Sequence, residues 1–184
     1  LTEFFKPYQA ARHRRNRAMV EKINALLPEM GLDYDKDVLP LSEAADNGGV
    51  TERHLMYALA KKLTARFGRG EPMVNKLTDM GLSLSEKQKA QMLDESYPFY
   101  AYDLLGILKS AFVPKLYIDA TDECPKLPEV VALCKEIGAK PFITINPAWN
   151  TPEENAAWVE YCNGTEDTYY ANLRRRDGYE EPFN

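Results

Sequence analysis

Apolar residues recur at the spacing of an α-helix through most of the first 112 positions of the chain. Two clear stripes predict helices over residues 7–30, with Pro7 in the first turn, and 51–67. Similar patterns predict helices at 71–80, 85–93 and 101–112, so residues 1–112 are expected to form a helical domain. The two stripes consist of Val20, Ile23, Leu27 and Met30, and of Leu55, Leu59 and Leu63.

Beyond residue 112 the pattern changes to short apolar runs that alternate with helical stretches. The runs at 115–120 and 141–146 predict buried strands, and the stretch 127–137 predicts a helix between them. A further helix begins after Thr151, where Glu154 completes a capping box. This order predicts a parallel β/α unit, part of a barrel, over residues 113–184. The expected fold class is therefore helix-rich α/β, a helical domain followed by a parallel β/α unit.

Composition indicates an ordinary globular chain. It has 184 residues, of which 45% are hydrophobic and 28% charged. No apolar run reaches the roughly 20 residues that cross a bilayer, and no signal peptide is recognisable. Three widely spaced cysteines fit reduced thiols, so we expect a soluble, cytoplasmic protein with no membrane partner. A start at Leu1 suggests a piece of a longer protein, whose remainder or other subunits would be missing.

Positive charge gathers in the first part of the chain. Residues 1–70 hold 12 Lys and Arg against 9 Asp and Glu, although the whole chain has a formal net charge of −5. No aromatic residues interleave the arginines between positions 12 and 17, as a stacking platform for nucleic acid would require. A solvated helix face explains these arginines better, and no nucleic-acid partner is expected.

Several polar residues lie where a ligand site is expected. The apolar stripe of the first helix continues toward its N-terminus as Asn16, His13 and Gln9, which indicates either hydrogen bonds to a buried loop or a site for an anion or metal. His54, in a first helical turn, is either a local hydrogen-bonding residue or a ligand. Other candidates follow the predicted strands, where ligands bind in β/α folds, although the acidic ones would also suit helix capping. These are Asp119, Asp122, Glu123, Asn146 and Asn150.

Up to about residue 140, the chain resembles metal-dependent phosphoesterases of the polymerase and histidinol phosphatase (PHP) superfamily. The resemblance rests on Arg15-Asn16 with the helix through Asn24, Leu26, Leu27 and Gly31, on His54-Leu55-Met56-Tyr57-Ala58-Leu59, and on Asp119 to Pro125. It implies a distorted β/α barrel with a helical insertion, in which a divalent metal (Mn, Zn or Mg) activates water to hydrolyse a phosphate ester.

The same resemblance implies roles for particular residues. Arg12, Arg15, Asn16 and Arg53 become candidates for binding the substrate or its phosphate. His13, His54, Asp119, Asp122 and Glu123 become candidates for binding the metal. The family uses several histidines, including a His-x-His pair, whereas this chain has only two. The active site within the chain is therefore expected to be incomplete, and no catalytic residue is assigned.

From about residue 130 onward, the chain resembles retaining α-L-arabinofuranosidases, which are β/α-barrel glycoside hydrolases. The residues that carry this resemblance are Thr151 to Gly164 (TPEENAAWVEYCNG), Tyr169 to Arg175 (YYANLRR) and Glu181 to Asn184 (EPFN). It implies two catalytic carboxylates that would both lie beyond Asn184. Glu153, Glu154 and Glu160 are then cap and surface residues, and Asn146 and Asn150 are the sugar-binding candidates.

Three functions follow, and each makes a different prediction about ligands. The favoured one is part of a metal-dependent hydrolase, a phosphoesterase of PHP type, acting on a small phosphorylated substrate. The alternative is a fragment of an α-L-arabinofuranosidase that binds a sugar. The third is a catalytically silent helical or interaction domain.

Overall fold

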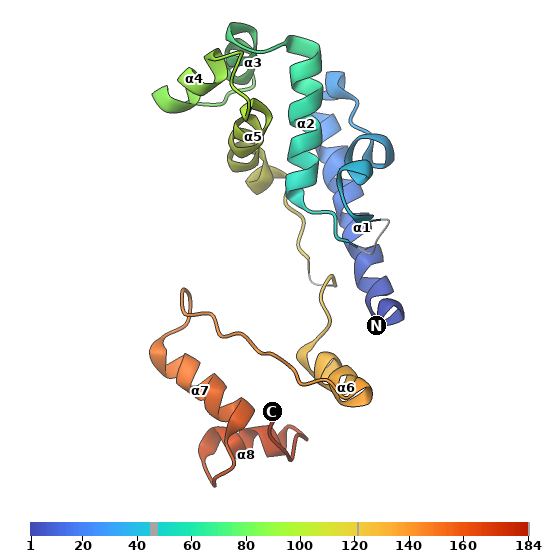
Figure 1. Cartoon of the computed structure of the whole chain (residues 1–184), viewed down its shortest axis with the longest axis vertical. Helices are drawn as coiled ribbons and strands as arrows, with labels where there is room; N and C mark the ends of the chain where they lie inside the picture. The colour runs from blue at the N-terminus through green and yellow to red at the C-terminus, as the bar shows by residue number, and fades with distance from the viewer. Residues whose placement is uncertain (45–47, 121, 184) are drawn as a thin grey trace. The chain divides into compact units, whose positions relative to one another are not determined.

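The computed structural model describes residues 1–44, 48–120 and 122–183, and all its regular structure is helical (Figure 1). The chain divides into two compact units, Leu1–Cys124 (unit 1) and Pro125–Asn184 (unit 2). Unit 1 contains α1 (Thr2–Leu26), α2 (Glu52–Phe67), α3 (Glu71–Asp79), α4 (Glu86–Leu93), α5 (Tyr100–Leu116) and the short turns η1 (Pro28–Met30), η2 (Tyr34–Val38) and η3 (Leu39–Leu41). Unit 2 contains α6 (Leu127–Ile137), α7 (Pro152–Asn163) and α8 (Tyr169–Arg176).

The core of unit 1 lies between α2 and α5, which run side by side (Figure 1). The predicted stripe of α2 is confirmed, because Leu55, Leu59 and Leu63 are fully buried. Ala58 and Ala60 are buried with them and leave room for a close neighbour. From α5, Leu104 and Leu108 complete this interface. The predicted division between residues 112 and 113 stays a prediction, and it falls within α5.

The first helix differs from its prediction at both ends. It begins at Thr2, so Pro7 lies inside the helix rather than in its first turn. It ends at Leu26 because Leu27 precedes Pro28, and a residue before proline disfavours the helical conformation. The chain then makes the turn η1, closed by Gly31 in the left-handed conformation at φ 50°.

Both predicted strands are wrong. Lys115 and Leu116 form the last turn of α5, and residues 117–120 have no regular structure. Residues 141–146 are also irregular, and no strand occurs in the ranges that the structure describes. A short apolar run does not distinguish a strand from a helix end, and an isolated pair of strands is at best marginal in water. The predicted parallel β/α unit and partial barrel are therefore corrected to a purely helical architecture over the described residues.

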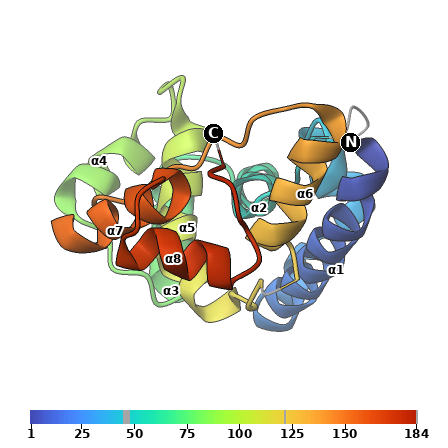
Figure 2. The same ribbon diagram turned by 90° about the horizontal axis from the view of Figure 1, so that it is seen from below.

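Unit 2 is small and has a limited apolar core. The predicted helix 127–137 is confirmed as α6, which ends at Gly138 with φ 69°. Helices α7 and α8 pack side by side (Figure 2). The core cluster consists of Val131, Cys162 and Phe183, with partly buried neighbours. None of the described helices of the chain is both long and apolar enough to span a bilayer.

Candidate functional site

The arginines predicted to bind phosphate face carboxylates of their own chain. Arg12 Nε lies 3.3 Å from Glu123 Oε2, and Arg15 Nε forms an ion pair with the other oxygen, Oε1, of the same carboxylate. Arg15 also contacts Glu52, with 3.0 Å between Nη2 and Oε1. The Glu123 side chain is only 3% exposed. Arg12 and Arg15, which were predicted to bind phosphate, are thus the counter-ions of Glu123, which was predicted to bind a metal.

The same contacts extend along the segment before Glu123. Arg14 Nη2 lies 3.2 Å from Asp122 Oδ2 in an exposed pair, and the Arg15 guanidinium lies 5.6 Å from the centre of the Tyr117 ring. Asp119 accepts a hydrogen bond from the backbone N–H of Ala120 at 2.7 Å. Tyr117, Asp122 and Glu123 are therefore connected to α1 by arginine side chains.

Asn16 and His13 make hydrogen bonds within unit 1. The buried Asn16 amide donates to the carbonyl of Val50 at 3.0 Å, which agrees with the predicted alternative of a hydrogen bond to a buried loop. His13 Nδ1 lies 2.6 Å from the hydroxyl of Tyr34. Burial raises the pKa of that phenol above its usual value, while the nearby Arg17 opposes the shift. These side chains connect α1 to the loops beside it.

His54 caps its own helix. The backbone N–H of Thr51 donates to His54 Nδ1 at 2.9 Å, so the histidine takes the place of the usual acidic residue in a capping box. Arg53, next to it, is exposed and forms no ion pair with a described residue. The prediction that these arginines and Asn16 bind phosphate stays a prediction.

Among the residues that the structure describes, no three His, Cys, Asp or Glu side chains gather where they could hold a metal ion. The reason is visible in the contacts above: Asp122 and Glu123 face arginines, His13 faces a tyrosine, and His54 caps a helix. The predicted metal-binding function is corrected accordingly.

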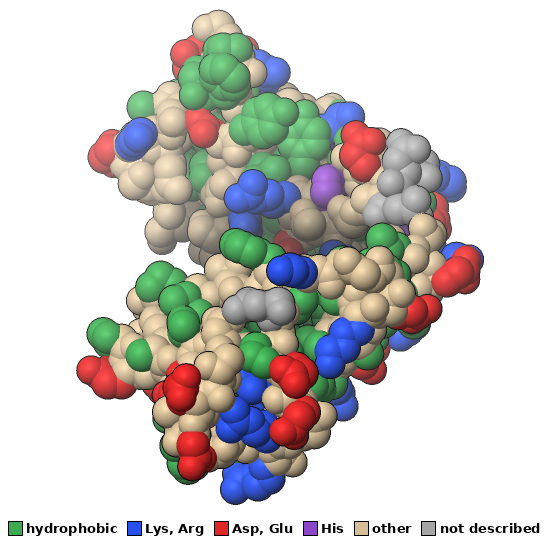
Figure 3. All heavy atoms as spheres, turned by 60° about the horizontal axis from the view of Figure 1, so that its bottom comes forward, with side chains coloured by type: hydrophobic (Ala, Val, Ile, Leu, Met, Phe, Trp, Pro, Cys, Tyr) green, Lys and Arg blue, Asp and Glu red, His purple; other side chains and the backbone are tan. Residues whose placement is uncertain are grey.

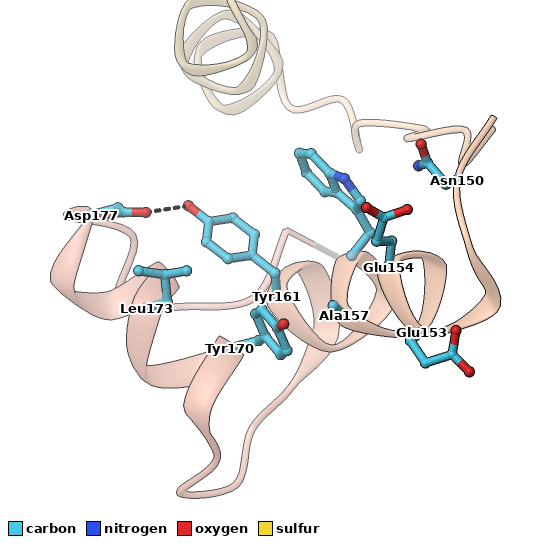
Figure 4. A pocket seen from close by; sticks show the side chains of 9 residues that line it. Asn150, Glu153, Glu154, Ala157, Tyr161, Tyr170, Leu173 and Asp177 are labelled. Atoms are coloured by element: carbon cyan, nitrogen blue, oxygen red, sulfur yellow. Dashed lines mark hydrogen bonds between the residues drawn. The ribbon is translucent and has the colours of Figure 1, made fainter.

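Unit 2 contains a pocket of about 580 Å³ between α7, α8 and the turn before α7 (Figure 4). Asn150, a predicted sugar-binding residue, lies at its edge and donates to Asn155 Oδ1 at 3.3 Å. Asn146 does not line this pocket; its Oδ1 accepts from the backbone N–H of Ala148 at 3.1 Å and shapes the turn. The lining consists of Asn150, Glu153, Glu154, Ala157, Trp158, Tyr161, Tyr170, Leu173 and Asp177.

Aromatic rings and carboxylates make up most of this lining. The hydroxyl of Tyr161 donates to Asp177 Oδ2 at 3.0 Å (Figure 4). Burial, together with this bond, raises the pKa of Tyr161 to about 12. Glu154 accepts from the backbone N–H of Thr151 at 2.7 Å, which confirms the predicted capping box. Apolar surface with a few oriented polar groups is the usual make-up of a small-molecule site.

Arg174 connects the segments that form this pocket, a structural role that the sequence did not reveal. Its side chain is fully buried in α8 and donates to four backbone carbonyls. These belong to Tyr161 and Gly164 at the end of α7 and to Tyr179 and Glu180 in the final segment. The only signal was position: Arg174 lies three residues after Ala171, on the face of α8 that is buried.

Comparison with known proteins found similarity over part of the chain. It is 52% identical over 56 residues to α-L-arabinofuranosidase C of Emericella nidulans, and 54% identical over 56 residues to a probable α-L-arabinofuranosidase C of Aspergillus niger. It is 40% identical over 55 residues to an intracellular exo-α-L-arabinofuranosidase of Bacteroides ovatus. These matches cover 30% of this chain and 11% of each relative, so the chain spans about a ninth of the length of these relatives.

No protein-family model matches the chain, and no solved structure does. The resemblance to α-L-arabinofuranosidases is thus supported over part of the chain. Nothing supports the resemblance to PHP phosphoesterases, and that favoured prediction is corrected in favour of the glycoside hydrolase alternative.

Proposed function

We propose that unit 2 is a segment of an α-L-arabinofuranosidase-type glycoside hydrolase. The similarity to proteins of that name supports this proposal. The matched length of 56 residues is close to that of unit 2, Pro125–Asn184. The residues Thr151 to Gly164, which carry the resemblance, form α7 and its caps. We therefore assign the match to this unit.

The pocket beside Asn150 is the observation that carries a binding role. Within the segment assigned to the relatives, it combines the ring surfaces of Trp158 and Tyr170 with an amide and carboxylates that can bond to hydroxyl groups. We propose that it binds a pentose such as L-arabinose. Hydrolysis needs a separate pair of carboxylates on either side of the sugar bond. Since Glu154 serves as a helix cap, we propose binding by this chain and no hydrolysis by it alone.

Exchange of the matched segment tests the assignment to a glycoside hydrolase. The 56 matching residues of the Aspergillus niger relative are replaced by those of this chain, and hydrolysis of an aryl α-L-arabinofuranoside is measured. The chimera is expected to keep activity, whereas a chimera with Arg174→Ala loses it because the segment no longer folds. Arg176→Ala, at an exposed arginine of the same helix, is the matched control. An inactive but folded chimera would refute the assignment.

Titration with L-arabinose tests the pocket in the chain itself. We expect the indole NMR signal of Trp158 to shift with an affinity in about the millimolar range, while that of Trp149, which does not line the pocket, stays constant. Trp158→Ala is expected to abolish the response, and inorganic phosphate should produce none. Equal shifts of both indoles, or no shift at all, would show that the pocket is not a sugar site.

A further inference from the structure

Unit 1 presents two stacked tyrosine rings where α2 and α5 lie side by side. The ring centroids of Tyr57 and Tyr102 are 5.4 Å apart, with 21° between the ring planes. Tyr57 in α2 is partly buried, whereas Tyr102 in the first turn of α5 is 62% exposed. Figure 3 shows surface positions at which hydrophobic side chains adjoin those of Lys or Arg. Tyrosine and arginine are both enriched at protein interfaces, so this pair of rings is a candidate contact surface.

Each tyrosine belongs to a stripe of residues along its own helix. Side chains one turn apart lie on the same face of a helix. Arg53 lies four positions before Tyr57 and Lys61 four positions after it, and both are exposed. In α5, the exposed Gly106 follows Tyr102 by four positions. Because the two rings are stacked, the two stripes adjoin, and we refer to these five residues as the tyrosine face.

Gly106 leaves the tyrosine face open in the interior of α5. A Cβ atom added at this position would meet nothing within 4 Å. Glycine destabilises the interior of a helix relative to alanine, and packing within the described chain does not require it here. A glycine also allows the backbone of a ligand or partner to approach closely. Gly106 is therefore a second indication, independent of the rings, that a partner covers this face.

The charge of the two helices indicates what kind of partner fits. Together α2 and α5 contain six Lys and Arg against two Asp and Glu, in a chain whose formal net charge is −5. Both carboxylates are engaged within the chain: Glu52 pairs with Arg15, and Asp103 accepts from Gln91 at 2.8 Å. The two cations of the tyrosine face form no ion pair with a described residue. The face therefore attracts negatively charged groups.

We propose that the tyrosine face binds an acidic segment of another polypeptide. Carboxylates of the segment meet Arg53 and Lys61, one of its apolar or aromatic side chains packs on the tyrosine rings, and its backbone passes over Gly106. Charge complementarity favours this occupant, because the same face of a second copy would bring like charges together. The net charge of −5 repels the polyphosphate backbone of a nucleic acid. The inference concerns unit 1 and does not depend on the proposed function of unit 2.

A synthetic copolymer of glutamate and tyrosine, in a four-to-one ratio, is the probe. Fluorescence anisotropy of the labelled copolymer is measured against the 184-residue chain, and we expect saturable binding with a Kd in about the micromolar range at low salt. Arg53→Glu should weaken binding at least about tenfold. Lys22→Glu, at an exposed lysine of α1, makes the same change in net charge and should have little effect.

Two further variants test the rings and the glycine. Tyr102→Ala should weaken binding at least about tenfold, whereas Tyr169→Ala, at a 70% exposed tyrosine of unit 2, should not. Gly106→Gln should weaken binding to a similar extent while it raises the melting temperature of unit 1 by about 2 °C, because glutamine favours the helix more than glycine does. Weaker binding by a more stable protein cannot result from unfolding.

Several results would overturn the proposal. The copolymer could fail to bind, or each variant and its control could weaken binding equally. Tighter binding of a single-stranded oligothymidylate would make a nucleic acid the ligand. Self-association of the chain that Arg53→Glu removes would make a second copy the occupant. Gly106→Gln with unchanged binding would remove the argument for close backbone approach at this face.

Discussion

The two units of this chain are held together in different ways. Unit 1 buries a continuous apolar core that involves its helices α1 to α5. Among its described residues, 125–183, unit 2 has three in its core cluster and exposes several large apolar side chains instead. Because burial of apolar surface is the main favourable term in folding, unit 1 has far more stabilisation within its own boundaries. The presence of helices in both units therefore does not imply a similar capacity to fold alone.

The arginines of the two units show the same contrast. In unit 1, Arg12 and Arg15 share the carboxylate of Glu123 as a counter-ion, and Arg15 also pairs with Glu52. In unit 2, Arg174 is surrounded by backbone carbonyls, so partial charges of peptide groups replace a counter-ion. A buried ion pair contributes little net stability, although removing one partner is costly. The ion pairs of Glu123 attach this residue to α1. The hydrogen bonds of Arg174 connect α7, α8 and the final segment of the chain.

Arg174→Ala should have the largest effect and should be confined to unit 2. It removes the donor that four backbone carbonyls share and empties a fully buried site, and we expect the free energy of unfolding of unit 2 to fall by about 3–5 kcal/mol. Both tryptophans, Trp149 and Trp158, lie in unit 2, so tryptophan fluorescence in a urea titration reports on this unit. Arg176→Ala should change little. Equal losses in the two variants would contradict the role of Arg174.

Leu59→Ala should destabilise unit 1 and leave unit 2 unchanged. This side chain is fully buried in α2, and its truncation is expected to destabilise unit 1 by about 3 kcal/mol through lost burial and a cavity. Circular dichroism should show earlier loss of helix while tryptophan fluorescence is unchanged. Leu26→Ala, at a 52% exposed leucine of α1, is the control with the same chemical change. A simultaneous shift of both signals would mean that the units unfold together.

Glu123→Gln and Asp122→Asn compare the stability contributed by a buried and by an exposed carboxylate in unit 1. Glu123→Gln removes the charge between Arg12 and Arg15, and we expect a loss of about 2–3 kcal/mol, because Glu52 still pairs with Arg15. Asp122→Asn removes a pair in which both side chains are 68% exposed, and should cost less than about 1 kcal/mol. Thermal unfolding followed by circular dichroism compares them. A larger effect at Asp122 would contradict the structure of this cluster.

The smallest effect expected is a pH dependence of unit 2. The folded pKa of Tyr161 is raised to about 12, above the ordinary value of 10, so the folded state holds this proton more tightly. The stabilisation is present below pH 10 and is lost as the pH rises from there toward 12. Asp177→Asn should lower the pKa of Tyr161, since it replaces the charged carboxylate that accepts from the phenol with a neutral amide. Ultraviolet titration, corrected with Tyr161→Phe, measures the shift; an unchanged pKa would leave burial as its sole cause.

Sequence reasoning was most successful where the interactions are local. The helices at 127–137 and after Thr151 agree with α6 and α7. The predicted alternative for His54, a local hydrogen bond, also agrees with its contact to Thr51. Such contacts lie within one helical turn, so the residues that form them are neighbours in the sequence.

The predicted phosphate and metal roles stay predictions, but the contacts of these residues depend on distant partners. Arg12 and Glu123 are 111 positions apart, and nothing in either local pattern indicates that they meet. Considered separately, an arginine cluster suggests an anion and an acidic cluster suggests a metal. Brought together, the two clusters neutralise each other and are no longer evidence for either ligand.

The sequence by itself determined most helices, their caps and the similarity to arabinofuranosidases, because these depend on spacing and on residue identity along the chain. Only the tertiary structure decided that the apolar runs at 115–120 and 141–146 are not strands, that Arg174 is buried, and that Asn150 borders a pocket. The physical reason is the same in each case. A strand needs a neighbour for its hydrogen bonds, and a buried charge needs compensating dipoles. Both come from outside the element that carries the residue, so the local pattern does not reveal them.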